Sequence, residues 1–256
     1  MKLFKLLVIG AIVILFISAL WMKIEVPGPP PEEKPREGEI FLPLPKLEGK
    51  VSLEEAIARR RSVREYLDSP LKLDEVSQLL WSAQGITDVK RGFRASPSAG
   101  ATYPLELYLL VREGGVEGLE AGIYKYDPHR HSIRLVRSGD FSRDLYSAAL
   151  KQKWVLEAPV NLVITAVYER TTKRYGERGI RYVHMEVGHV GQNVYLQATA
   201  LNLGSVVVGA FYDEEVKEII GAPKEVPLYI IPIGRVERLH QLTQEELDQY
   251  YTERRG

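Results

Sequence analysis

The first apolar run of the chain lies at its beginning. Leu6–Met22 holds 17 residues without a charge, with two lysines before it and one after it. This length is at the lower limit for a helix that spans a membrane. The excess of positive charge before the run predicts that the rest of the chain lies outside the membrane. A cleavable signal peptide is the alternative, because Ile17-Ser18-Ala19 is an acceptable cleavage site. We favour an uncleaved membrane anchor over residues 1–22.

A proline-rich stretch follows the apolar run. Val26–Pro45 contains seven of the 15 prolines of the chain, with glutamates and lysines between them. Such segments are extended and semi-rigid. We therefore expect residues 23–46 to form a spacer and not part of a folded core.

Helical and strand patterns alternate from residue 47 onward. Ser52 and Glu55 form a capping box before a first helix, which the arginines at 59–61 close. Leu105–Arg112 and Ala158–Val167 are nearly continuous apolar runs, which is typical of buried strands. Val183–Leu203 has apolar residues at every third or fourth position and predicts the longest helix.

Weaker patterns complete the domain. They are a helix capped by Asp74 and ended by Gly85, a hairpin of Gly122–Tyr126 and Ser132–Val136, a helix over Phe141–Lys151, a mobile segment over Tyr168–Tyr182, a β-rich piece with a tight turn over Ser205–Phe211, a helix from Asp213 to Gly221, and a strand over Leu228–Gly234. Pro232 in that last strand indicates an edge strand or a bulge. Because regular βαβ repetition is missing, the order predicts an α+β domain over residues 47–238. An amphipathic helical tail over residues 239–256 follows it.

Polar residues form a stripe beside the apolar face of the predicted long helix. The stripe consists of Glu186, His189, Asn193 and Gln197. Either water and neighbouring elements cover it, or it is a polar seam at a subunit interface. Two further histidines, His129 and His131, fall in the hairpin turn, where we expect them to be solvated, since that loop offers too few ligands for a metal.

Composition excludes several classes of function. The chain has 34 basic and 34 acidic residues, which does not favour nucleic-acid binding. It has no cysteine, so disulfides, thiolate nucleophiles and cysteine-ligated metals are excluded. It contains neither the glycine fingerprint of a dinucleotide-binding domain nor the serine elbow of a hydrolase.

Two stretches have the residue types of an anion-binding site. Arg60, Ser62 and Arg64 alternate at the end of the first helix, and guanidinium groups bind phosphate oxygens in pairs. The loop Arg94–Pro104 (RASPSAGATYP) is rich in small and hydroxyl-bearing residues, so a flat or anionic ligand can approach its backbone closely.

These two stretches together resemble the nitroreductase superfamily of FMN flavoproteins, and more narrowly its SagB-type dehydrogenase branch. Arg60-x-Ser62-x-Arg64 matches the family pattern for the FMN phosphate, and Pro97–Pro104 matches the branch pattern Pro-Ser-Ala-Gly-x-x-Tyr-Pro. The resemblance extends from about Ser52 to Val236. It implies a central, mostly antiparallel sheet flanked by helices, and a homodimer with FMN at the subunit interface.

The resemblance also implies roles for particular residues. The phosphate would be neutralised by Arg60, Ser62, Arg64 and the basic Arg235 after the last strand. The flavin ring would be covered by the loop residues Ser96, Pro97, Ser98, Ala99 and Gly100, contributed by the partner subunit. Backbone groups of the tight turn at Val208, Gly209 and Ala210 would lie near the reactive nitrogen of the ring.

The catalytic residues that the resemblance implies are Lys173, Arg174 and Tyr175. SagB-type relatives use a Lys-Tyr pair on modified peptides, but here Arg174 stands at the lysine position by the Tyr-Gly register. Arginine is a poor general base because it keeps its charge. We therefore expect an FMN-dependent oxidoreductase whose substrate is an unidentified small molecule or peptide. The alternative is a membrane-tethered FMN carrier without turnover of its own.

Overall fold

The computed structural model describes residues 34–256, of which residues 35–256 form one compact unit. The expected membrane anchor and the first part of the proline-rich spacer lie outside the described residues. Within residues 34–256, no helix has both the length and the apolar character that crossing a bilayer requires.

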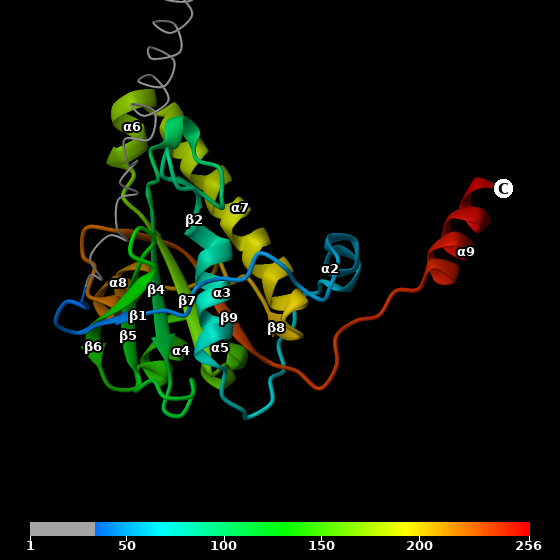
Figure 1. The fold of residues 1–256 in the computed structure, drawn as a ribbon, viewed down its shortest axis with the longest axis horizontal. Coiled ribbons are helices and arrows are strands. Elements are labelled where there is room, and N and C mark those ends of the chain that lie inside the picture. The colour runs from blue at the N-terminus through cyan, green and yellow to red at the C-terminus, as the bar shows by residue number, and fades with distance from the viewer. Residues whose placement is uncertain (1–33) are drawn as a thin grey trace, which may run out of the picture. The chain divides into compact units, whose positions relative to one another are not determined.

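A seven-stranded sheet forms the centre of the unit (Figure 1). Its strand order is β1-β6-β5-β4-β7-β9-β8, and all neighbouring pairs are antiparallel. The strands are β1 (Glu39–Phe41), β4 (Leu105–Val111), β5 (Gly122–Asp127), β6 (Ser132–Ser138), β7 (Val160–Ala166), β8 (Leu203–Ser205) and β9 (Val226–Arg235). β2 (Ile86–Asp88) and β3 (Phe93–Arg94) pair separately. The predicted α+β class with a mostly antiparallel sheet is confirmed.

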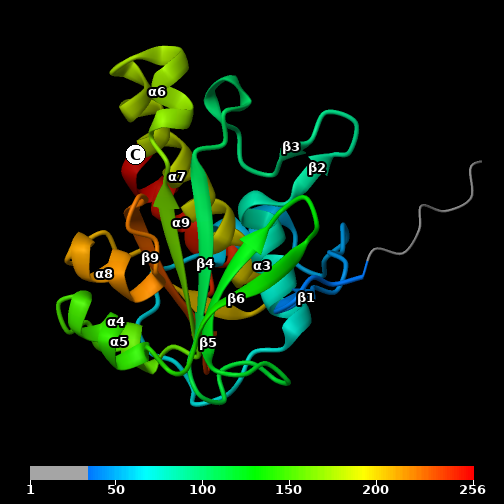
Figure 2. The ribbon, with the colours of Figure 1, turned by 90° about the vertical axis from the view of Figure 1, so that its left-hand side faces the viewer.

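Helices cover both faces of the sheet, and each face has its own hydrophobic core (Figure 2). Successive side chains of a strand point to opposite faces. In β4, Leu107 and Leu109 therefore enter one core, while Tyr108 and Leu110 enter the other. The first core also contains residues of α3 (Leu73–Gln84) and α7 (Arg178–Ala200), and the second contains residues of α4 (Ser142–Ala148), α5 (Lys153–Glu157) and α8 (Asp213–Ile220).

Most predicted helix ends are close to the observed ones. In α2 (Leu53–Arg59), Ser52 Oγ accepts a hydrogen bond from the Glu55 N–H at 3.1 Å, as the capping pattern predicts. α3 starts two residues earlier than expected, because Lys72 is its N-cap and Asp74 lies in the first turn. α8 ends at Gly221, which adopts the left-handed conformation that glycine tolerates best.

The long helix α7 buries its apolar face in the first core, and neighbouring elements cover much of its polar stripe. Asn193 Nδ2 donates to the Ser82 carbonyl at 3.0 Å and to Ser96 Oγ at 3.1 Å. Gln197 Oε1 accepts from Gln78 Nε2 at 3.3 Å. Within the single chain, neighbouring elements therefore cover Asn193 and Gln197, as the first of the two predicted alternatives states, while a polar seam at a subunit interface stays a prediction.

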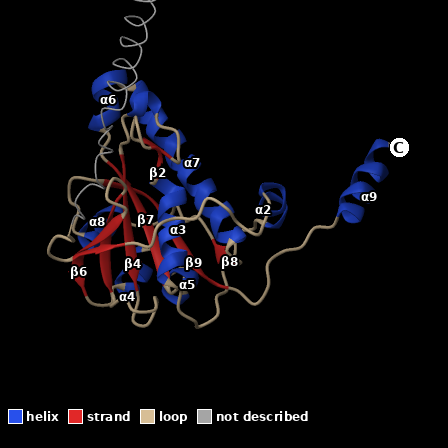
Figure 3. Cartoon of the chain, viewed as in Figure 1, coloured by secondary structure: helices blue, strands red, loops and turns tan. Residues whose placement is uncertain are grey.

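The segment predicted to be mobile is helical instead (Figure 3). Residues 169–175 form α6 (Glu169–Tyr175), and α7 begins at Arg178, five residues earlier than the apolar pattern indicates. Contacts with the sheet and with the loop before β4 stabilise α6, and no periodicity along the chain reports such contacts.

Part of the predicted spacer belongs to the domain. β1 pairs with β6 at the edge of the sheet, and Leu42 is buried. His131 secures this segment, so its prediction as a solvated turn residue is wrong. Its Nε2 lies 3.0 Å from the Pro43 carbonyl oxygen, and its Nδ1 lies 2.9 Å from the Tyr126 hydroxyl.

For Pro232 the predicted edge strand is wrong, because β9 is an interior strand between β7 and β8. The other predicted alternative, a bulge, occurs in β9 but between Pro227 and Tyr229 and not at Pro232. The Pro232 carbonyl accepts a hydrogen bond from Val206, just beyond the end of the short strand β8. In an antiparallel strand the N–H and C=O of one residue point to the same side. The missing proline N–H therefore lies at the interruption of the ladder between the end of β8 and the bridge of Val208 with Ile230.

The tail forms α9 (Gln244–Arg255), as expected for a C-terminal helix. Thr243 caps it in a capping box with Glu246, and none of its residues is buried.

Candidate functional site

Three guanidinium groups of the arginine cluster have no carboxylate partner among the described residues, those of Arg60, Arg61 and Arg64, and that of Arg61 donates only to the carbonyls of Ala58 and Arg60. Arg59 pairs with Glu55 at 2.7 Å, so it is not free for a ligand. Arg60 lies over the ring of Tyr195, 5.3 Å from its centroid, and Arg64 lies over Trp154 at 5.2 Å. Within the described part of the chain, neither Arg60 nor Arg64 forms an ion pair. Two such cations beside an exposed hydroxyl, that of Ser62, suit a phosphate group.

Strand β8 holds the phosphate-binding segment in place. The Val63 N–H donates to the Ser205 carbonyl at 2.9 Å, and Ser62 forms a parallel bridge with Ser205. Gly204 allows this close approach because it has no side chain. A Cβ atom at this position would lie only 2.9 Å from Val63 Cβ, which is too close for two carbon atoms. The segment is therefore extended, so Ser62 and its neighbours Arg61 and Val63 point to alternate sides.

The turn after β8 offers two free backbone donors. Gly209 and Ala210 are exposed, and their N–H groups have no partner in the described structure. Val208 differs from its prediction, because its N–H and carbonyl both pair with Ile230, at 2.8 and 3.0 Å. Only Gly209 and Ala210 can therefore bind a ligand through their backbone N–H groups.

The Ser/Pro loop presents only part of its predicted residues. Ser96 is fully buried, and its hydroxyl donates to the Ala83 carbonyl at 2.8 Å. It anchors the loop and does not face a ligand, which corrects its predicted role. Ser98 Oγ accepts from the Tyr103 N–H at 2.9 Å, while Pro97 and Gly100 are exposed and Ala99 is half-buried.

Backbone strain is concentrated in the same loop. Gly100 has a φ of 60°, and Ala101 and Tyr103 also have positive φ values, 53° and 44°. Residues other than glycine rarely adopt this conformation, and such strain is common at functional sites.

Two of the three predicted catalytic residues meet this loop. Arg174 Nη1 donates to the Gly100 carbonyl at 3.2 Å. A Cβ atom on Gly100 would lie 2.5 Å from the Tyr175 hydroxyl oxygen, so the Tyr175 side chain lies directly beside Gly100. Lys173 is exposed and forms no hydrogen bond or ion pair with any described residue.

Arg235 lies in a different set of contacts from the one predicted. Its Nη2 pairs with Glu75 at 2.8 Å, and its Nε donates to the Pro70 carbonyl at 3.0 Å. These bonds fasten β9 to the start of α3. Its guanidinium is therefore engaged with Glu75, unlike those of Arg60 and Arg64.

Two residues that the sequence did not assign to the site support the loop, Glu186 of the polar stripe and Arg94 at the start of the loop itself. Glu186 is 2% exposed, and burial raises its pKa to about 7 against the opposing effects of Ser98, Gln84 and Arg94. Arg94 lies over the ring of Tyr103 at 4.5 Å. The sequence did contain a signal for Glu186, since it lies among the valines that α7 buries, and burying a charged side chain costs free energy.

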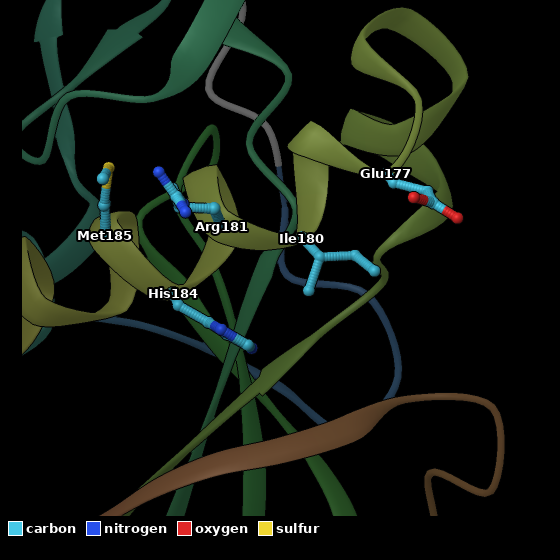
Figure 4. Close-up of a pocket in the computed structure, with 5 residues that line it drawn as sticks. All are labelled: Glu177, Ile180, Arg181, His184 and Met185. Carbon is cyan, nitrogen blue, oxygen red and sulfur yellow. The ribbon is translucent and has the colours of Figure 1, made fainter.

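A shallow hollow of about 610 Å³ lies beside the predicted catalytic residues, on the first turns of α7 (Figure 4). It is lined by Glu177, Ile180, Arg181, His184 and Met185. His184 Nε2 lies 2.5 Å from the Tyr168 hydroxyl. None of the predicted cofactor-binding residues lines this hollow.

Comparison with known proteins agrees with this geometry. Residues 57–235 match the model of the nitroreductase family. A candidate nitroreductase of Methanocaldococcus jannaschii is 56% identical over 192 residues, which are 75% of this chain and 94% of that protein. The microcin B17-processing protein McbC of Escherichia coli is 28% identical, over 65% of this chain and 63% of its own length.

Solved structures show the same arrangement. The crystal structure of a candidate nitroreductase from Ralstonia eutropha superposes with a TM-score of 0.69 at 29% identity, covering 78% of this chain and 90% of that one. The residues that match the family model, 57–235, include the arginine cluster, the Ser/Pro loop and the turn after β8. The chain therefore belongs to the nitroreductase family, and its distant relatives include microcin-processing McbC.

Proposed function

We propose that this protein is an FMN-dependent oxidoreductase. The observation that supports this most strongly is the pair of unneutralised guanidinium groups of Arg60 and Arg64 beside the exposed hydroxyl of Ser62. Their charge and donor types fit the phosphate of FMN. The segment that carries these arginines is hydrogen-bonded to β8, and the free N–H groups of Gly209 and Ala210 follow shortly after β8. One ligand with a phosphate at one end and a polar ring at the other therefore fits both sets of groups.

Each group has a separate task in this proposal. When bound, FMN supplies the two-electron chemistry. Arg60, Ser62 and Arg64 hold its phosphate, while the N–H groups of Gly209 and Ala210 orient its ring. Pro97 to Gly100 would cover the ring, and the hydrogen bond from Arg174 to Gly100 keeps that loop in its strained conformation.

The substrate proposal departs from the SagB-type relatives at one residue. Arg174 is charged and bonded to the loop, so it does not accept a proton as the lysine of the branch does. Tyr175 packs edge-to-face on Tyr182, with ring centroids 5.1 Å apart. We propose a redox substrate other than the azoline rings of modified peptides, which would meet the Tyr175 hydroxyl beside Gly100 of the loop.

The cofactor proposal is tested by purifying the full-length protein in mild detergent. We expect a yellow protein that releases FMN, and not FAD, on denaturation. Arg60→Ala should weaken FMN binding by about 1.5–3 kcal/mol, because a charged hydrogen bond is lost. Arg61→Ala is the matched control, since Arg61 bonds only to carbonyls of its own segment. A colourless protein that takes up no added FMN would refute the proposal.

Location is a further proposal and rests on the sequence alone. We propose that Leu6–Met22 anchors the chain in a membrane and that the domain lies outside the cytoplasm. NAD(P)H is not supplied on that side of the membrane. The protein should then remain in the membrane fraction after washing with alkaline carbonate. Protease added to intact cells stripped of outer wall should release the domain. If the domain stays protected until lysis, the orientation is wrong.

A further inference from the structure

Tyr195 connects two parts of the candidate site that are far apart along the chain. It lies on α7 and is half-buried. Its hydroxyl oxygen lies 2.9 Å from Ser62 Oγ and accepts the Val207 N–H at 2.8 Å. Its ring also supports the guanidinium of Arg60. The Tyr195 side chain therefore has two contacts with the phosphate-binding segment, at Arg60 and Ser62, and one contact with Val207, two residues before Gly209.

The hydrogen-bond inventory of this hydroxyl determines what Ser62 can do. The Val207 N–H is a donor only, so it uses a lone pair of the Tyr195 oxygen and leaves the phenol proton free. A phenol is a stronger acid than an alcohol and is the better donor of the two. The favoured arrangement has Tyr195 donating to Ser62 Oγ. The Ser62 proton then points away and can be donated to an anion.

We propose that Tyr195 is a positioning residue of the flavin site, which orients the Ser62 hydroxyl toward the phosphate and sets the path of the turn that leads to Gly209. This inference rests on the proposed FMN function, but Tyr195 itself need not touch the cofactor. Without the phenol oxygen, Ser62 can donate to a nearby carbonyl instead, and the Val207 N–H loses its acceptor. Ring stacking under Arg60 persists in phenylalanine and is lost only with an aliphatic residue.

The test is a set of variants of the full-length protein in mild detergent, stripped of flavin and titrated with FMN. Tyr195→Phe and Ser62→Ala should each raise the Kd for FMN about tenfold, the scale of one hydrogen bond to a charged group. The double variant should bind about as weakly as Tyr195→Phe alone, because Tyr195 acts on the phosphate through Ser62 and its removal already includes that effect. Tyr195→Leu should bind more weakly than Tyr195→Phe, since Arg60 also loses its support. Tyr146→Phe is the control, as that hydroxyl has no hydrogen-bond partner among the described residues.

A spectral readout separates positioning from loss of stability. Tyr195→Phe should shift the visible absorption bands of bound FMN, because the turn before Gly209 relaxes, whereas Ser62→Ala should leave the bands in place. Unchanged FMN affinity in Tyr195→Phe would overturn the inference while leaving the FMN proposal intact. A double variant weakened about a hundredfold would overturn it as well, because the two residues would then act independently. If the folded wild-type protein binds no FMN, the proposed function fails and the inference fails with it.

Discussion

At the scale of single residues, the support under the Ser/Pro loop is a cluster of buried polar groups with incomplete hydrogen bonding. Glu186 Oε1, Gln84 Nε2 and Arg94 Nε are buried and have no hydrogen-bond partner among the described residues. Arg94 Nη1 does reach Gln84 Oε1, at 3.2 Å, and the Arg94 N–H donates to the Tyr103 hydroxyl at 3.1 Å. Unmade bonds of this kind reduce stability. The cluster thus adds to the strain of the loop it supports.

The pKa of Glu186 leads to a prediction about stability. Burial raises this pKa from 4.5 to about 7, so the folded state holds a proton that the unfolded state releases. The stabilisation is complete below pH 4.5 and is lost as the pH rises through about 7. Glu186→Gln should therefore stabilise the protein at pH 8 by about 1–3 kcal/mol, with little effect at pH 4.5. Urea unfolding at both pH values measures this.

Glu177→Gln, at an exposed glutamate of the same helix region, controls for the change of amide for carboxylate. An equal gain for the two variants, or a gain at pH 4.5 as large as at pH 8, would show that the protonation of Glu186 does not govern stability.

Local residue patterns are most informative where neighbouring residues act together. The Arg60-x-Ser62-x-Arg64 spacing predicted a phosphate site, and in the structure no carboxylate of the described residues pairs with Arg60 or Arg64, so both stay available for that role. Arg235 and Ser96 were harder, because their partners Glu75 and Asn193 are 160 and 97 positions away. No pattern within a strand or a loop reports which distant group will engage a side chain.

At the scale of elements, α6 shows why a helix can be missed. It has seven residues, mostly polar or β-branched, and isolated helices of this length are not stable. Tertiary contacts supply what the sequence lacks. Arg170 pairs with Glu106 of β4 at 2.5 Å and donates to the Tyr103 carbonyl at 3.0 Å. The Thr171 hydroxyl, at 2.8 Å from that of Thr102, adds a third link to the loop.

The ion pair of α6 continues into the sheet. Lys125 of β5 lies 3.1 Å from Glu106 and 3.0 Å from Glu225. Burial alone would lower the pKa of Lys125, but its hydrogen bonds and the nearby carboxylates outweigh that effect and raise it. The lysine is therefore charged at any ordinary pH and holds Glu106 in position for Arg170.

This arrangement predicts that α6 is released when Arg170 is removed. In Arg170→Gln, amide hydrogen exchange of residues 169–176 should become at least about tenfold faster, since the loss of a charged contact of about 1.5 kcal/mol shifts local opening by that factor. Exchange in the C-terminal half of α7 should stay the same. Arg178→Gln is the control, because Arg178 is exposed and forms no ion pair within the described residues. Equal exchange in both variants would show that α6 is held by its packing alone.

At the scale of the whole molecule, the two sides of α7 have different surroundings, one buried and one exposed. Its apolar face is buried in the first core, so that face is not available for subunit association. A different face remains exposed, with Arg181, Met185, Gly188 and Gln192 at spacings of four, three and four. Near its C-terminal half, a groove of about 940 Å³ between α2, α3 and α7 is lined by Leu47 and Leu53, which are 84% and 61% exposed.

We propose that a second copy of the chain covers this exposed surface, as the homodimer implied by the family resemblance requires. Apolar side chains exposed together over several elements usually mark an interaction surface. Gly188 is the sharpest probe, because a Cβ atom there would meet nothing within 4 Å in the single chain. Gly188→Arg should leave folding intact, and light scattering at micromolar concentration should show a dimer for the wild type and a monomer for the variant. Glu215→Arg on α8, in the opposite layer, should remain dimeric.

If the Ser/Pro loop covers the flavin of the partner subunit, the Gly188→Arg monomer should also lose most of its FMN. A monomer that binds FMN with wild-type affinity would place the whole site within one chain.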